Sequence, residues 1–302
     1  MKILNLSYDD YANYAHENAN ALRATGAYCV DLKRIKHSFG YESESKVSST
    51  DEIKKQIKQA DIVQLFHSDS TWLNYAFDLG KKIYVYHTGT TYRQNSQHCN
   101  NIFNPFVNAA FTDQCEFIGL GMKNEKYIAT AINTDKFKCL NWKVSEKYFI
   151  AHYPSNPIVK GTGKIKQMLD ELNISSYNID TTILAHSKQM QRMSDCDIYI
   201  ELFSPYQNGK PYGCFGVTAF EAASLGKLVV TNNIRNDVYE KEYGESPFFI
   251  ANCETKFKSV LQYLLIQEKN KIKELQEKTR ELMIQRHSYV SSGNYLKKAL
   301  DL

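Results

Sequence analysis

The sequence predicts an α/β fold of two similar lobes, each built on a mostly parallel sheet with helices on both faces. Short apolar stretches alternate with helical patterns along the chain, which is typical of parallel sheets. The alternation stops in a polar stretch at residues 136–146 and then starts again. The length of 302 residues suits two domains of ordinary size.

The first half of the chain begins with a buried strand and a capped helix. Asp9 or Asp10 can cap that helix, which ends at Gly26. A second, charged helix places Ile53 and Ile57 on one face. Strands are predicted at residues 1–6, 28–32, 61–67, 82–87, 109–112 and 126–128. Helices are predicted at residues 10–24, 51–60 and 72–79 and near residue 116.

The second half repeats the alternation after the polar stretch, which we interpret as a linker. The predicted lobes are residues 1–138 and 139–302, and the last helix could pack back on the first lobe. Strands are predicted at residues 148–152, 182–185, 197–202 and 228–231. Helices are predicted at residues 163–172, 188–194, 217–225 and 255–285, the last of them broken near residue 269. Because open parallel sheets bind ligands at the carboxyl ends of their strands, a cleft between the lobes is the expected site.

Composition excludes several classes of protein. The net charge of +4 is too small for the basic stripe of a dedicated nucleic-acid binder, although the second half is mildly basic. Seven single cysteines without a CxxC pair indicate reduced thiols in a cytoplasmic protein. The N-terminus lacks the apolar run of a signal peptide, and no window is long and apolar enough to span a membrane. The histidines and cysteines show no spacing typical of a metal site.

The most informative segment is YGCFGVTAFEAASLGKLVVT, at residues 212–231. Gly213 and Gly216 precede a predicted helix, where glycines let a ligand approach the backbone and the helix N-terminus favours an anionic diphosphate. Glu221 follows one turn into the helix and could accept hydrogen bonds from sugar hydroxyls. The alternative is a plain loop that enters an amphipathic helix with a surface glutamate.

This segment resembles family-four (group one) glycosyltransferases of the GT-B fold, which has two Rossmann-like lobes that face a central cleft. The match consists of Gly216, Glu221-Ala222, Gly226-Lys227 and Val229-Val230. The family often has a first glutamate eight residues before the second, where this chain has Gly213, and a proline where it has Leu228. The resemblance implies that main-chain amides of Gly213, Cys214, Phe215 and Gly216 could take over donor contacts.

A second match opens the C-terminal lobe, in AHYPSNPIVKGT at residues 151–162. In the family, a Lys-Gly pair follows the first strand of this lobe and the lysine contacts the donor diphosphate, a role that here falls to Lys160. Such a lysine would stabilise the leaving group as the sugar–phosphate bond breaks. The usual arginine a few residues earlier is missing, and Asn156 is expected near the donor instead.

The remaining site residues are also implied by the resemblance. His87 ends a predicted strand of the N-terminal lobe, and it would face the cleft near the transferred sugar unless it is a core histidine. His67 has the same position on the preceding strand. Asp9 and Asp10 could line the acceptor side or only cap a helix, and His186 falls where family members hold the nucleotide base.

The expected activity is transfer of a hexose or pentose, with retention of configuration, from a nucleotide-diphosphate sugar to a hydroxyl. A UDP-sugar is the favoured donor, bound by the C-terminal lobe without a metal or other cofactor. The acceptor stays open among an envelope glycan, a glycolipid and a hydroxylated base in phage DNA. The alternatives are a nucleotide-sugar epimerase of the same fold and a non-catalytic partner subunit of a glycosyltransferase.

Overall fold

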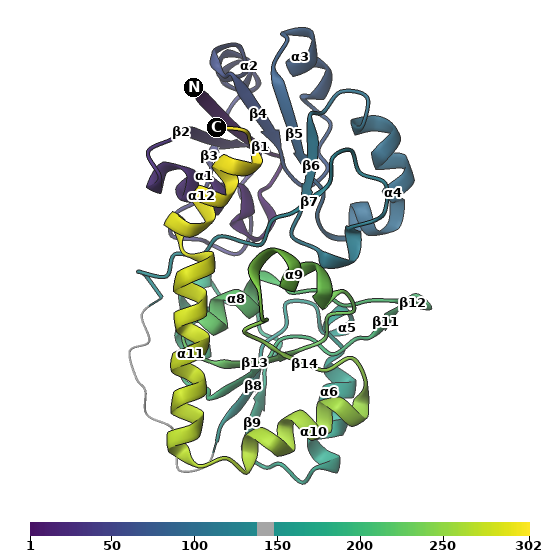
Figure 1. Cartoon of the computed structure of the whole chain (residues 1–302), viewed down its shortest axis with the longest axis vertical. Helices are drawn as coiled ribbons and strands as arrows, with labels where there is room; N and C mark the ends of the chain where they lie inside the picture. The colour runs from purple at the N-terminus through teal and green to yellow at the C-terminus, as the bar shows by residue number, and fades with distance from the viewer. Residues whose placement is uncertain (138–147) are drawn as a thin grey trace. The chain divides into compact units, whose positions relative to one another are not determined.

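The computed structural model describes residues 1–137 and 148–302, which form two compact units. Unit 1 consists of Met1–Asn133 together with His287–Leu302, and unit 2 of Thr134–Arg286 (Figure 1). In the part of the chain that is described, no helix is long and apolar enough to cross a membrane. The predicted linker at residues 136–146 lies almost entirely outside the described residues.

Unit 1 is built on a seven-stranded parallel sheet with the order β3-β2-β1-β4-β5-β6-β7. Its strands are β1 (Lys2–Ser7), β2 (Tyr28–Lys33), β3 (Lys46–Val47), β4 (Ile62–Leu65), β5 (Lys82–Tyr86), β6 (Ala109–Thr112) and β7 (Lys126–Tyr127). Its helices are η1 (Tyr11–Asn13), α1 (Tyr14–Ala24), α2 (Thr50–Gln59), α3 (Leu73–Asp78), α4 (Gly89–Phe103), η2 (Cys115–Phe117) and α12 (Tyr289–Ala299). All strands predicted for this half are present, and the order places β1 and β4 at the centre.

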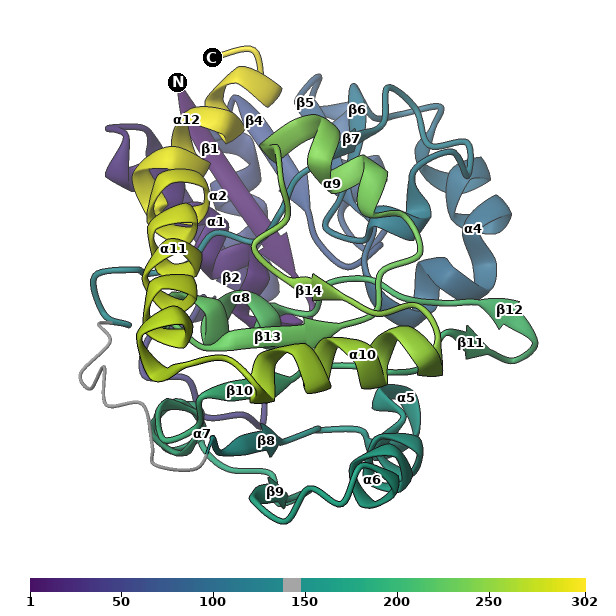
Figure 2. The same cartoon turned by 60° about the horizontal axis from the view of Figure 1, so that its bottom comes forward.

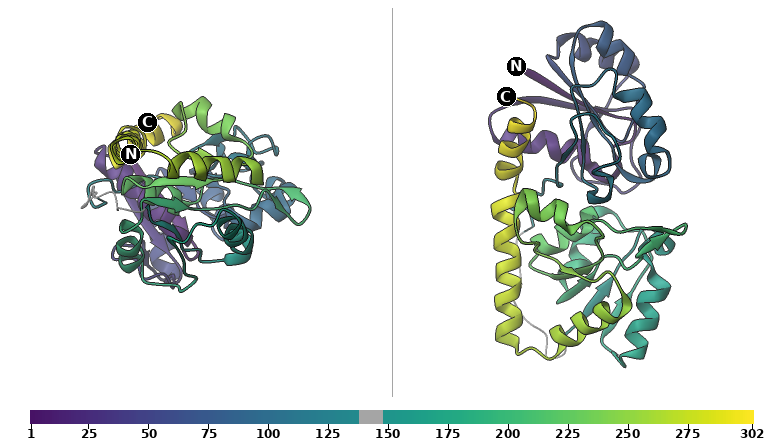
Figure 3. Two further views of the ribbon diagram at one scale, coloured as in Figure 1. Left: turned by 90° about the horizontal axis from the view of Figure 1, so that it is seen from below. Right: turned by 45° about the vertical axis from the view of Figure 1, so that its right-hand side comes forward.

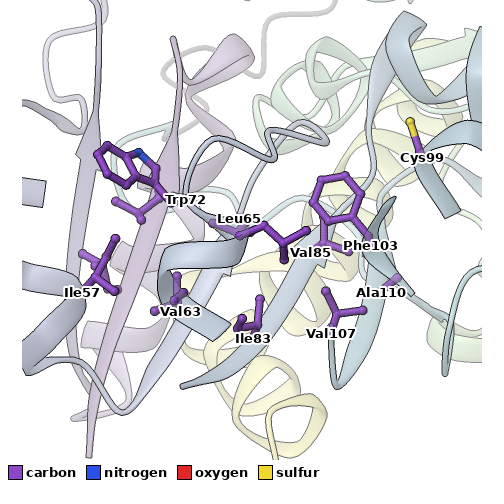
Figure 4. Packing of buried hydrophobic residues seen from close by; sticks show 14 of the residues in the cluster. Ile57, Val63, Leu65, Trp72, Ile83, Val85, Cys99, Phe103, Val107 and Ala110 are labelled. Carbon is purple, nitrogen blue, oxygen red and sulfur yellow. The ribbon is translucent and has the colours of Figure 1, made fainter. Parts of the chain in front are cut away.

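Both faces of this sheet are covered by helices. Successive side chains of a strand point to opposite faces, so each strand contributes to two cores. On β5, Ile83 and Val85 pack into a core with α2, α3 and α4 (Figure 4). Tyr84 and Tyr86 of the same strand belong to the opposite core, with α1 and α12. The central strands of unit 1 are therefore largely apolar on both faces, as in a sheet covered on both sides.

The C-terminal helix α12 packs against α1 and completes unit 1. A Cβ on Gly293 would lie 2.1 Å from the carbonyl oxygen of Ala21, so only glycine permits this close approach. Tyr289 donates a hydrogen bond to Glu17, and Lys297 donates one to the carbonyl oxygen of Thr25 at 3.3 Å. The two ends of the chain consequently lie near each other in unit 1 (Figure 3).

Unit 2 contains a five-stranded parallel sheet with the order β14-β13-β10-β8-β9. Its strands are β8 (Ile150–His152), β9 (Tyr177–Ile179), β10 (Ile198–Ile200), β13 (Leu228–Thr231) and β14 (Phe249–Ile250), and the hairpin β11 (Tyr206–Gln207) and β12 (Lys210–Pro211) reaches outward from the unit (Figure 2). Its helices are α5 (Pro157–Lys160), α6 (Thr162–Glu171), α7 (His186–Ser194), α8 (Val217–Ser224), α9 (Asn236–Tyr243), α10 (Glu254–Leu265) and α11 (Lys269–His287). Helices α6 and α10 cover one face of the sheet in a shared apolar core.

Two of the differences from the prediction have a clear physical reason. The strand predicted at residues 182–185 is wrong, because the strand is β9 and residues 180–185 belong to no helix or strand. Asp180 holds this segment by accepting hydrogen bonds from the Thr182 amide at 2.8 Å and from Arg192 at 2.8 Å. Helix α4 was not predicted, because its Thr- and Asn-rich sequence has low helix propensity and its buried face supplies the stability.

Candidate functional site

The candidate site lies at the carboxyl edge of the unit 2 sheet. Three segments meet there: α5 after β8, the end of β10, and the glycine-containing loop that precedes α8 (Figure 2). Strands β8, β10 and β13 are neighbours in the sheet, so whatever follows them lies on a common edge. Parallel sheets bind ligands at this edge.

Lys160 is positioned by the junction between α5 and α6. Asn156 caps α5, since its side-chain oxygen accepts a hydrogen bond from the Val159 amide at 3.2 Å. Gly161 follows with φ of +71°, and a Cβ there would lie 1.9 Å from the carbonyl oxygen of Phe203. The Phe203 amide in turn donates to the Lys160 carbonyl at 3.1 Å. Glycine is thus required at 161 for α5 to lie against the segment after β10.

The ammonium of Lys160 forms an ion pair with Glu201, a residue that the sequence analysis did not single out. Glu201 follows β10, and residues two apart on a strand share a face, so its side chain points with that of Tyr199 toward α8. Its second oxygen accepts a hydrogen bond from the Thr231 hydroxyl at 3.0 Å. The Thr218 hydroxyl lies 3.5 Å from the first oxygen. A glutamate directly after the apolar run IYI was the signal in the sequence, because a charge at such a place needs a partner.

The loop at residues 213–216 approaches this ion pair closely. A Cβ on Gly216 would lie 2.4 Å from Glu201 Oε1 and 2.9 Å from Lys160 Nζ. Gly213 has φ of +150°, and a Cβ there would lie 2.1 Å from Asn232 Nδ2. Any side chain at either position would therefore displace a group of the site. These contacts explain why the two glycines predicted from the sequence are needed.

The two residues between these glycines turn their side chains into the protein. Cys214 and Phe215 are buried, and the Phe215 ring packs against Phe248 with ring centroids 4.5 Å apart. Burial of both side chains anchors the loop and leaves its main chain as the part that can face a ligand. Gly216 caps α8, whose N-terminus carries the partial positive charge that favours anions.

Glu221 and His186 form a second polar pair in unit 2. The Nε2 atom of His186 lies 2.6 Å from Glu221 Oε1, and both side chains are almost buried. His186 is the first residue of α7, and Glu221 is in the second turn of α8. The ring of Phe137 packs edge-on against His186 with centroids 6.0 Å apart. Two residues expected separately at the site are thus in direct contact.

His152, in contrast, has a structural role. It is buried at the end of β8 with Nδ1 2.7 Å from the Ile200 carbonyl oxygen and Nε2 2.9 Å from the Thr162 hydroxyl. A carbonyl can only accept, so Nδ1 carries the proton and Nε2 accepts from Thr162. Burial lowers the pKa of His152 to about 4. The neutral ring joins β8, β10 and the start of α6.

In unit 1, His87 is buried and does not reach the surface of the unit. Its ring stacks on Tyr92 with centroids 4.4 Å apart, and its Nδ1 lies 2.9 Å from the Ser68 hydroxyl. Burial lowers the pKa of His87 to about 3, so the ring is neutral. Its Nε2 has no hydrogen-bond partner among the described residues. The expected contact from His87 to a sugar would require this atom to become accessible.

His67 is the more accessible histidine at the carboxyl edge of the unit 1 sheet. It adopts a left-handed backbone with φ of 61°, and its Nδ1 lies 2.7 Å from the Thr88 hydroxyl. Its Nε2 lies 3.6 Å from Asp10 Oδ1. Burial opposes ionisation of Asp10, but the neighbouring His67 ring and hydrogen bonds from the Ala15 amide and Ser45 outweigh it and lower the pKa of Asp10. Burial raises the pKa of nearby Asp113 to about 6.

Of the two roles considered for Asp10, the structure shows helix capping. Its two carboxylate oxygens accept hydrogen bonds from the amides of Ala15 at 2.7 Å and His16 at 3.1 Å. Ser45 donates a further hydrogen bond at 3.0 Å. The carboxylate of Asp10 therefore stabilises the first turn of α1, and the His67 ring lies next to this carboxylate. Over residues 1–137 and 148–302, no three His, Cys, Asp or Glu side chains gather in a way that could hold a metal ion.

No family model matches this sequence, and no curated protein sequence matches it either. Solved structures do resemble it. Anabaena HepE in complex with UDP matches over 100% of both chains with a TM-score of 0.70 and 13% identity. HepE in complex with UDP-glucose matches over 100% of this chain and 99% of that chain, with a TM-score of 0.67 and 12% identity.

Sucrose-phosphate synthase from Thermosynechococcus elongatus matches 100% of this chain and 98% of its own, with a TM-score of 0.61 and 10% identity. AviGT4, a glycosyltransferase of avilamycin A biosynthesis, matches 98% of this chain and 96% of its own, with a TM-score of 0.59 and 9% identity. These likenesses extend over the whole chain and establish its fold. The predicted GT-B fold is confirmed.

Proposed function

We propose that this protein is a glycosyltransferase that binds a nucleotide-diphosphate sugar, favouring a UDP-sugar, in unit 2. The observation that carries the proposal is the meeting of Lys160 with the loop at residues 213–216. A lysine ammonium beside glycine main chain at a helix N-terminus is a site for a diphosphate. The resemblance in fold to HepE, whose structures contain UDP and UDP-glucose, supports this ligand.

Each group of the site then has a chemical task. Lys160 and the loop amides stabilise the charge that develops on the diphosphate as the sugar–phosphate bond breaks. Glu221, oriented by His186, accepts hydrogen bonds from donor hydroxyls. Because Lys160 already supplies a cation, the proposal assigns no task to a metal ion. The acceptor hydroxyl attacks the anomeric carbon as the nucleoside diphosphate leaves, with retention of configuration, and its proton passes to a donor phosphate oxygen.

The acceptor is assigned to unit 1, where His67 is the polar side chain best placed for it. Its side chain is 16% exposed, with Nε2 buried beside Asp10 and Nδ1 in contact with the Thr88 hydroxyl. An acceptor hydroxyl could hydrogen-bond to this ring after displacing Thr88. A glycan, a glycolipid and a hydroxylated DNA base all provide such a hydroxyl, and the resemblance to family-four enzymes applies equally to the three.

Thermal-shift measurements with nucleoside diphosphates and their sugars test the proposal. A ligand that binds the folded state raises the melting temperature, so UDP and UDP-sugars should stabilise the protein. Glu221→Ala should abolish transfer from the stabilising donor, and because it also breaks the almost buried pair with His186, the melting temperature of the variant is measured beside its activity. Wild-type turnover by this variant would reject the assignment of Glu221. Conversion of the donor without any acceptor would instead identify an epimerase.

A further inference from the structure

Glu201 places a fixed negative charge at the proposed diphosphate site. Its side chain is 0% exposed, whereas that of Lys160 is 20% exposed. The loop glycine Gly216 is close to both, since its missing Cβ would lie 2.4 Å from the carboxylate and 2.9 Å from the ammonium. A phosphate bound on this loop would therefore lie near the carboxylate as well as near the lysine.

The two members of the ion pair differ in their freedom to move. Glu201 follows directly from the central strand β10, its amide donates to the Val230 carbonyl at 2.9 Å, and its Oε2 is held by Thr231 at 3.0 Å. Lys160 ends a helix of four residues and reaches the carboxylate through a flexible four-carbon stem. When a diphosphate arrives, the ammonium can turn toward it while the carboxylate stays where it is.

We propose that Glu201 discriminates between nucleotide sugar and free nucleoside diphosphate by repelling the more highly charged of the two. This inference rests on the proposed function. A terminal phosphate has a second ionisation with a pKa of about 6, so UDP carries nearly one more negative charge than UDP-glucose at pH 7.5. Repulsion by a fixed charge grows with the charge of the ligand. Glu201 therefore favours release of the product over loss of the donor.

Glu201→Gln tests this directly, because glutamine keeps the shape and one acceptor oxygen but not the charge. Calorimetric titration at pH 7.5 should show UDP binding about fivefold tighter and UDP-glucose binding about threefold tighter than in the wild type, because the Coulomb energy scales with ligand charges of about −3 and about −2. The ratio of the two dissociation constants should shift toward UDP. If the carboxylate only positioned Lys160, the affinities would change in the opposite direction, since its loss would weaken the binding of both ligands.

The neighbouring carboxylate provides a matched control. Glu221 lies in the same unit but is assigned to donor hydroxyls. Glu221→Gln should therefore weaken the binding of UDP-glucose and of UDP rather than tighten it. Glu171, exposed on α6 and paired with Lys258, should give unchanged affinities as Glu171→Gln. The inference thus predicts opposite signs for two buried carboxylates and no effect for a surface one.

A second comparison is made between two variants that both lack the Lys160 ammonium. Breaking a buried ion pair on one side is destabilising, whereas removing both charges is tolerated. Lys160→Met combined with Glu201→Gln should therefore fold at least as well as Lys160→Met alone. The double variant should also bind UDP at least about threefold more tightly than Lys160→Met does, because the two proteins differ only in the repulsion by the carboxylate. This step holds even where Glu201→Gln alone does not fold.

The outcomes separate this inference from the proposed function. Wild-type protein that binds neither UDP nor UDP-glucose would reject both. Wild-type protein that binds them, with UDP bound no more tightly after Glu201→Gln in either background, would reject the discriminator and leave the donor site in place. Tighter UDP binding in both backgrounds, with a smaller gain for UDP-glucose, is the expected result.

Discussion

At the scale of single residues, His152 makes the folding of unit 2 sensitive to acid. Its pKa is lowered from 6.5 to about 4 by burial, so between pH 4 and pH 6.5 this histidine is protonated in the unfolded chain and neutral in the folded chain. The stabilisation is complete above pH 6.5 and is lost as the pH falls toward 4. The difference amounts to about 3 kcal/mol at pH 4.

His152→Gln should remove this dependence, because glutamine can still donate to Ile200 and accept from Thr162 but does not titrate. Urea unfolding between pH 4 and 7.5 is the measurement. We expect the free energy of unfolding of the variant to change less with pH than that of the wild type. An equally steep dependence in the variant would show that His152 takes up no proton on unfolding.

At the scale of elements, the sequence predicted those parts whose pattern is local. Lys160 and the loop at 213–216 were found because each follows a strand or opens a helix, and that order along the chain places them on one edge of the sheet. Glu201 was missed because its partners Lys160 and Thr231 come from other elements, so only the folded sheet brings them together. Helix α4 was missed for a related reason, since its burial rather than its propensity stabilises it.

The junction between α5 and α6 provides a prediction with a matched control. Gly161→Ala would place a Cβ 1.9 Å from the Phe203 carbonyl oxygen at a φ of +71°, and Lys160 would move with the backbone. A Cβ at Gly163 would meet no atom within 4 Å, and this residue lies in α6. We expect Gly161→Ala to lower the free energy of unfolding by about 2–4 kcal/mol and Gly163→Ala to raise it by about 0.5–1 kcal/mol. Urea unfolding of both variants is the check, and equal stabilities would contradict the account.

At the scale of the whole molecule, the sequence predicted two α/β lobes, and solved structures confirm the GT-B fold. The return of the chain to unit 1 through α12 was expected from the sequence only as one option, because the packing of α12 on α1, with the close approach of Gly293 to Ala21, joins segments far apart in the chain. Within unit 1, His87 also shows the limit of a motif. Its place after β5 was predicted, but its burial against Tyr92 follows from the unpredicted helix α4.

The central claim is that unit 2 binds a nucleoside diphosphate through Lys160, and calorimetric titration with UDP tests it most directly. The control is Lys164→Ala, a nearby lysine on α6 that pairs with Glu254 at 2.9 Å. We predict that UDP binds the wild type and Lys164→Ala equally, and Lys160→Ala at least about tenfold more weakly, the loss expected for one charge-assisted contact. Absence of UDP binding by the wild-type protein, or the same dissociation constant for Lys160→Ala, would contradict the claim.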